Sequence, residues 1–63
     1  MKVGDYVVIK DTNDNDLADW LEEQEEKNIT KHLIVDIDKE LGVFWVENCD
    51  YAIWLNEDIF YLV

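Results

Sequence analysis

The chain has 63 residues, of which 16 are Asp or Glu and 5 are Lys, with no Arg and a formal net charge of −11. A chain of this length has room for one hydrophobic core, so we expect a single domain over residues 1–63. Because 49% of the residues are hydrophobic, and 3 Trp, 3 Tyr and 2 Phe are among them, the acidic composition does not indicate disorder.

This composition also excludes classes of partner. Nucleic-acid binding depends on clustered Lys and Arg, so we expect no direct contact with nucleic acid, and none with an anionic membrane. The longest apolar runs, 51–55 and 59–63, are too short to span a bilayer, and we expect no signal peptide because no apolar run follows Met1-Lys2-Val3. A single Cys fits a reducing compartment, so we expect a soluble, cytoplasmic protein. The charge favours a basic protein partner, although it can also serve solubility alone.

The sequence of the N-terminal half predicts one strand and one helix. Tyr6 to Ile9 is a β-branched and aromatic run that favours a strand, and the polar stretch 11–16 is typical of a turn before a helix. The residues that follow share one helical face at spacings of three, four and seven: Leu17, Trp20, Leu21 and Gln24. Asp14 or Asp16 is the expected N-cap, and Asn28 the expected C-terminal stop.

From Lys31 onward the hydrophobic period is two, which predicts strands. Leu33, Val35 and Ile37 are expected on one face of the first of these strands, and His32, Ile34, Asp36 and Asp38 on the other. A hairpin loop over 38–42, in which Gly42 takes the left-handed conformation, leads to strands over 43–47, 51–55 and 59–62. A tight turn at 48–50 and a single helical turn at 56–58 connect the last three strands.

Two segments resemble a known family. The opening VGDYVVI (3–9) resembles the first strand of small SH3-like barrels, and YAIWLNEDI (51–59) resembles their end, where an aromatic strand, a polar turn and a short closing strand follow one another. The resemblance implies a mainly β fold with one short helix: a five-stranded SH3-like barrel with a helix inserted in the long first loop. Small SH3-like proteins are common in bacteriophages and mobile elements, which implies a binding or accessory role without catalysis.

The sequence contains more apolar residues than one small barrel needs. The expected core is Val7, Ile9, Leu33, Val35, Ile37, Phe44, Val46, Ala52, Trp54 and Ile59. The opposite strand faces would then carry an apolar partner-binding surface, for which the candidates are Tyr6, Val8, Ile34, Trp45, Tyr51 and Ile53. If the opposite strand faces formed the core instead, a similar number of apolar residues would remain on the outside. A homodimer that pairs the outer faces is one way to bury these residues.

The acidic residues gather in two places, seven from Asp14 to Glu26 and three from Asp36 to Glu40. The candidates for binding a basic partner are Asp14, Asp16, Asp19, Glu22, Glu23, Glu26, Asp36 and Asp38. If the partner is a nucleic-acid-binding protein of a phage host, these carboxylates stand in for phosphates, and the protein acts as an inhibitor by charge mimicry of DNA. The alternative is a structural homo-oligomeric accessory protein that has no host target.

A second alternative is calcium binding through residues 11–22. Oxygen ligands stand at positions 1, 3, 5, 9 and 12 of an EF-hand-like spacing: Asp11, Asn13, Asn15, Asp19 and Glu22. Asp16 in place of the usual Gly, Ala18 at position 8 and a preceding strand all oppose this interpretation. A lone His32, and a Cys49 next to the carboxylate of Asp50, predict neither an enzyme nor a cofactor site.

Overall fold

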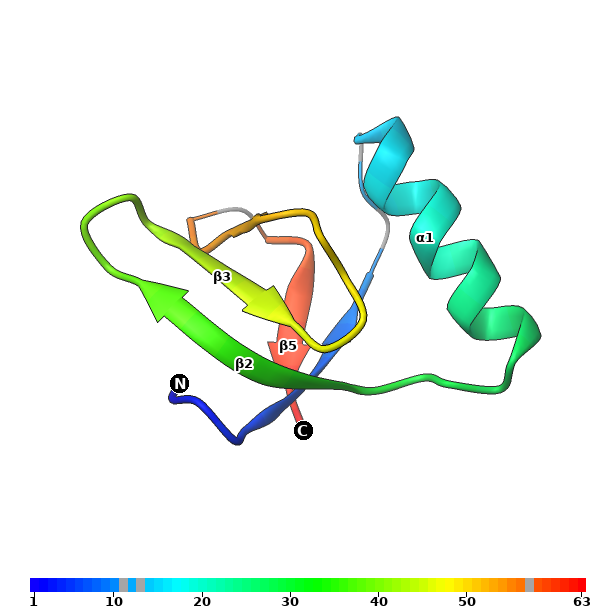
Figure 1. The fold of residues 1–63 in the computed structure, drawn as a ribbon, viewed down its shortest axis with the longest axis horizontal. Coiled ribbons are helices and arrows are strands. Elements are labelled where there is room, and N and C mark those ends of the chain that lie inside the picture. Colours follow the sequence, from blue (N-terminus) through cyan, green and yellow to red (C-terminus); the bar gives the residue numbers. More distant parts are fainter. Residues whose placement is uncertain (11, 13, 57) are drawn as a thin grey trace.

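The computed structural model describes residues 1–10, 12, 14–56 and 58–63. Its elements, in chain order, are β1 (Tyr6–Ile9), α1 (Asn15–Glu26), β2 (His32–Asp38), β3 (Val43–Val46), β4 (Ile53–Trp54) and β5 (Phe60–Leu62). Helix α1 stands at one side of the sheet, between β1 and β2 in the sequence (Figure 1). No helix in the described part of the chain is both long enough and apolar enough to cross a membrane.

The five strands form one antiparallel sheet in the order β4-β3-β2-β1-β5. The closing strand β5 returns to pair with β1, where Val8 faces Tyr61 and Ile9 faces Phe60. Strands β4 and β5 therefore lie at opposite ends of the hydrogen-bonded order, and no ladder joins them within the described residues. The prediction of a mainly β domain with five strands and one helix is confirmed in this open-sheet form. Among the described residues of 56–58, Asn56 lies in a turn and Asp58 in a bend, so the predicted helical turn is wrong for these two.

Helix α1 begins and ends as the sequence predicts. The Asp14 side chain accepts hydrogen bonds from the backbone N–H groups of Asp16 and Leu17, at 3.0 and 3.2 Å, which makes Asp14 the N-cap. At the other end Asn28 has a positive φ of 61°. The N–H of Asn28 donates to Glu25 and that of Ile29 to Gln24, the two bonds of a Schellman motif.

Strand β2 contains a β-bulge that the sequence did not predict. Its register with β3 shifts between Ile34 and Asp36, so Val35 is the extra residue. Val35 is 47% exposed, whereas Ile34 is completely buried. The predicted faces are therefore wrong at four neighbouring residues, since Leu33 is only half-buried and lies outside the core cluster: His32, Leu33, Ile34 and Val35. Because the extra residue reverses the alternation, Ile37 still packs against the core as expected.

Strand β4 also presents the opposite face to the core from the one predicted. The pairing of Phe44 with Ile53 buries Ile53, which is 1% exposed, and turns Trp54 outward with 51% exposure. Ala52 is exposed as well. The buried core unites the helix and sheet: Val7, Leu17, Trp20, Ile34, Phe44, Val46, Cys49 and Ile53. Val7, Phe44 and Val46 are core residues as the sequence predicts.

Candidate functional site

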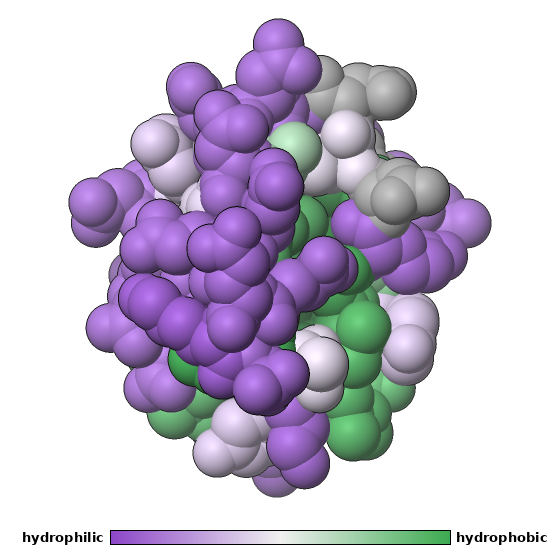
Figure 2. All heavy atoms as spheres, turned by 90° about the vertical axis from the view of Figure 1, so that its right-hand side faces the viewer, coloured by the Kyte–Doolittle hydropathy of each residue, from purple (hydrophilic) through white to green (hydrophobic). Residues whose placement is uncertain are grey.

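The outer face of α1 is an exposed row of carboxylates. All the predicted acidic contact residues from this region are exposed: Asp14, Asp16, Asp19, Glu22, Glu23 and Glu26. Figure 2 shows this hydrophilic surface, with an apolar band beside it. Within the described residues only Glu23 of this row has a basic partner, Lys27, at 3.3 Å. Exposed pairs of this kind contribute little stability, so the row remains strongly negative.

The other two predicted acidic contacts lie elsewhere. Asp36 and Asp38 occupy the end of β2 that lies away from α1 (Figure 1). The Asp38 carboxylate accepts hydrogen bonds from the N–H groups of Glu40 and Leu41, both at 3.0 Å, and so shapes the hairpin turn. The Asp36 carboxylate accepts from the N–H of Ile37 at 2.9 Å. The predicted acidic set is therefore divided between two surfaces, and the helix carries the larger.

One flank of the helix brings predicted acidic and apolar contacts together. A hollow of about 180 Å³ is lined by Asp16, Asp19, Trp20, Glu23 and Tyr51. The Tyr51 side chain is 40% exposed there, and Trp20 is nearly buried. Carboxylates beside the exposed ring of Tyr51 suit a Lys or Arg side chain, which gains ion pairing from the carboxylates and cation–π attraction from that ring.

Trp20 also anchors the helix to the sheet. Its indole N–H donates to the backbone carbonyl of Asn48 at 2.7 Å. Its ring lies 4.9 Å from that of His32, centroid to centroid, at an angle of 51°. Burial lowers the pKa of His32, and the nearby charge of Glu47 acts in the opposite direction. The contacts of Trp20 with Asn48 and His32 therefore fix the position of α1, and with it the position of the acidic row.

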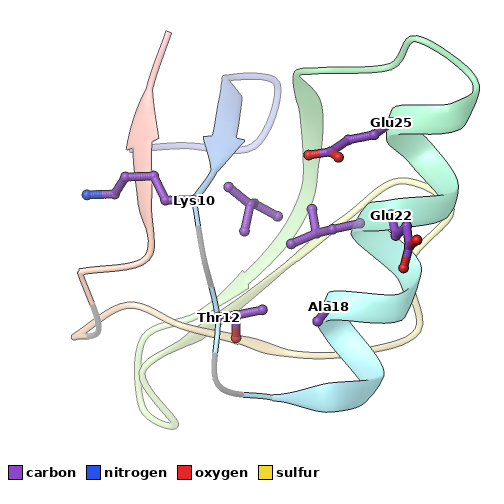
Figure 3. A pocket seen from close by; sticks show the side chains of 7 residues that line it. Lys10, Thr12, Ala18, Glu22 and Glu25 are labelled. Carbon is purple, nitrogen blue, oxygen red and sulfur yellow. The ribbon is translucent and has the colours of Figure 1, made fainter.

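A groove runs along the other flank of α1, between the helix and β1. It has a volume of about 480 Å³ and is lined by Ile9, Lys10, Thr12, Ala18, Leu21, Glu22 and Glu25. In Figure 3 the Glu25 carboxylate projects from the helix toward the strands, whereas the Lys10 ammonium points away from the helix. Lys10 pairs instead with Asp58, at 3.1 Å. The charges that the helix supplies to this groove are thus carboxylates only.

The predicted apolar contacts divide into exposed and buried residues. Tyr6 is 44% exposed, and Val8 and Trp45 are half-buried. Ile34 and Ile53 are buried core residues, so their assignment to a partner surface is wrong. The β2 bulge and the pairing of β4 with β3 turn these two side chains inward. Tyr61 and Trp54, which were not predicted as contacts, are about half exposed on the outer strand faces.

The calcium interpretation finds no support in the described residues. Asn15 is the first residue of α1, so Asn15, Asp19 and Glu22 follow one another along a helix face and do not surround a common centre. The other two candidate ligands, Asp11 and Asn13, lie outside the described residues. No group of three His, Cys, Asp or Glu side chains in the described chain is placed to hold a metal ion.

Cys49 belongs to the buried core. It is buried, and burial raises the pKa of its thiol, with the charge of Asp50 adding to the effect. The thiol lies 3.6 Å from the backbone carbonyl of Tyr51. A buried thiol with a raised pKa is a weak nucleophile at neutral pH.

The groove is the feature that sequence reasoning missed, although its signal was present. Residues 18, 21, 22 and 25 recur at spacings of three, four and seven, which places them on one helical stripe beside the buried one. Only knowledge of where β1 lies shows that this stripe faces Ile9. Comparisons with protein-family models, curated proteins and solved structures found no match to this chain.

Proposed function

We propose that this chain is a small protein-interaction module that binds a basic protein surface through the acidic face of α1. The observation that carries the proposal is the hollow at which Asp16, Asp19 and Glu23 meet the aromatic rings of Trp20 and Tyr51. This arrangement suits the side chain of a partner Lys or Arg. The surrounding carboxylates strengthen the attraction and increase the rate of encounter.

The spacing of these charges supports a partner that ordinarily binds nucleic acid. Helix α1 carries six acidic residues between Asp16 and Glu26, a distance of about 15 Å along the helix axis. This is roughly one charge per 2.5 Å, within a factor of two of the one per 1.7 Å of duplex DNA. The helix is therefore suited to occupy a phosphate-binding surface and to inhibit the protein that owns it.

The SH3-like identity is part of the same proposal. It is supported by the opening segment 3–9, by the polar segment that follows β4, and by the pairing of the closing strand β5 with β1. A barrel of this family would close by bringing β4 and β5 together. Proteins of this kind in phages and mobile elements have binding or accessory roles, which agrees with an acidic inhibitor acting on a host protein.

Affinity capture with matched variants tests the proposal. The bait variant D19N/E23Q removes two charges from the hollow, and the control variant E40Q/E47Q removes two charges from exposed positions elsewhere. We expect the unmodified protein to retain basic, nucleic-acid-binding proteins at low salt and to release them when duplex DNA or salt is added. D19N/E23Q should capture much less than E40Q/E47Q. Equal capture by the two variants, or capture that survives high salt, would contradict the proposal.

A second candidate function is homo-oligomerisation through the outer strand faces. It is favoured by the exposed aromatic side chains of Tyr6, Trp54 and Tyr61. Val8 pairs directly with Tyr61, so apolar side chains are continuous across β1 and β5. Sedimentation at micromolar concentration separates the candidates, because a monomer at physiological salt removes this one.

A further inference from the structure

We infer that the groove between α1 and β1 is a docking site for a short basic segment of the partner protein, with one or two apolar side chains as anchors. The inference rests on the proposed function, since it takes the partner to be basic, and it adds a site and a requirement for apolar anchors. The groove lies on the opposite flank of α1 from the hollow of Asp16, Asp19 and Tyr51.

Three of the seven described lining residues supply apolar surface to the groove, and the other four are polar or charged. Ala18 and Leu21 come from the helix and Ile9 from β1, and all three are half-buried. A smaller hollow of about 180 Å³ shares Ile9, Leu21 and Glu25 with the groove and extends it toward Val8, Ile29 and His32. The apolar residues of the two hollows adjoin one another through Ile9 and Leu21, which line both. Burying that surface against an anchor side chain is favourable because it removes apolar area from water on both partners.

The charge at the rim selects the occupant. Glu22 and Glu25 line the groove from the helix, and both are exposed. Lys10, the one cation among the described lining residues, points away and pairs with Asp58. A purely apolar occupant would leave the carboxylates without partners, and an acidic one would be repelled. Lys or Arg on either side of an apolar anchor satisfies both the walls and the rim.

The length of the groove limits the segment. Ala18 and Glu25 are seven residues apart, which corresponds to about 10 Å along the helix. That distance accommodates one or two anchor side chains and their flanking basic residues. The occupant is therefore a short linear segment and not a large flat surface.

Two labelled model peptides test the inference. Both have the same number of lysines, and they differ only in carrying leucine or serine at two interior positions. We expect the leucine peptide to bind at least about tenfold more tightly than the serine peptide at low salt, because its anchors are buried. A18F fills the groove and should bring the affinity of the leucine peptide down to that of the serine peptide. The serine peptide should bind A18F and the unmodified protein equally.

A pair of charge variants locates the rim. E22Q/E25Q removes the two carboxylates of the groove, and E26Q/E40Q removes two exposed carboxylates that line neither the groove nor the hollow. The leucine peptide should lose more affinity with E22Q/E25Q. Circular dichroism and urea unfolding of each variant separate lost binding from lost folding.

The outcomes distinguish this inference from the proposed function. If both peptides bind equally well, or if A18F keeps the preference for leucine, the groove is not the docking site, although binding of a basic partner to the helix stands. If neither peptide binds at low salt, the proposed function itself fails and the inference fails with it. Equal losses in E22Q/E25Q and E26Q/E40Q also overturn the assignment of the rim.

Discussion

His32 is the only histidine of the chain, and it is packed against Trp20 in the core. Burial lowers its pKa below the ordinary value of 6.5, because the charged imidazolium is poorly solvated there. In the unfolded chain the same group protonates near pH 6.5. The unfolded state therefore binds more protons as the pH falls below that value, and protonation favours unfolding.

We predict that His32 makes the protein less stable as the pH falls from 7.5 through 6.5 toward the lowered pKa of the folded state. The stability that the neutral His32 side chain contributes is fully present above pH 6.5, the pKa of this group in the unfolded chain. Protonation of carboxylates changes stability over a lower pH range, so the readout is the difference between the unmodified protein and H32Q in urea unfolding at pH 7.5 and 5.5. The free energy of unfolding of the unmodified protein should fall more between these values than that of H32Q.

The charge of Glu47 provides an internal check on this prediction. It raises the pKa of His32 against the effect of burial, so E47Q should lower that pKa further in an NMR titration. Parallel pH profiles for the unmodified protein and H32Q would contradict the proposed role of the buried imidazole. An unchanged His32 titration in E47Q would contradict the assignment of the opposing charge.

At the scale of elements, the bulge in β2 decides which side chains form the core. It leaves Ile34 completely buried and Val35 nearly half exposed, although the two are sequence neighbours of similar character. We predict that I34A lowers the free energy of unfolding by about 2–5 kcal/mol, the usual cost of removing a buried Ile side chain. V35A should cost clearly less.

Urea unfolding of these two variants measures the effect. Since a 63-residue domain has a total stability of only about 3–9 kcal/mol, I34A is expected to be near the limit of folding at 25 °C. Near-ultraviolet circular dichroism at 10 °C then provides a second reading of tertiary packing. If V35A costs as much stability as I34A, or more, Val35 is a core residue as the regular alternation predicts. That result would contradict the bulge in β2.

The elements that sequence reasoning predicted well are those with local causes. Asp14 caps α1 and Asn28 ends it because each acts on backbone groups within a few residues. Gly42 takes a positive φ of 73° in its hairpin for the same reason. The residue types at these positions are enough to predict the helix ends and the hairpin turn, because no tertiary contact decides them.

The errors arose where a distant partner decides the outcome. Ile53 is buried because its strand aligns it with Phe44, and the sequence of β4 alone fits either face. The bulge at Val35 depends in the same way on the register with β3. Of the candidate site, the acidic row could be read from composition, whereas the groove requires the placement of Ile9 against α1.

At the scale of the whole molecule, the charge of −11 acts on folding and on binding in opposite directions. The carboxylates repel one another in the folded state, where they are closer together than in the unfolded chain. Salt screens this repulsion, since the Debye length falls from about 10 Å at 0.1 M to about 3 Å at 1 M. The same screening weakens attraction to a basic partner.

We therefore predict that NaCl stabilises the isolated protein while it dissociates the complex. Raising NaCl from about 0.05 to 0.5 M should increase the urea midpoint of unfolding and reduce the affinity for a lysine-rich peptide by tenfold or more. Potassium glutamate in place of NaCl controls for effects specific to chloride. Because the described residues contain only two ion pairs, both exposed, screening has little native attraction to remove. A urea midpoint that falls with NaCl would mean that attraction between opposite charges outweighs repulsion in the folded protein. The carboxylates of α1 would then stabilise the fold, which would contradict the view that their repulsion is retained for binding a basic partner.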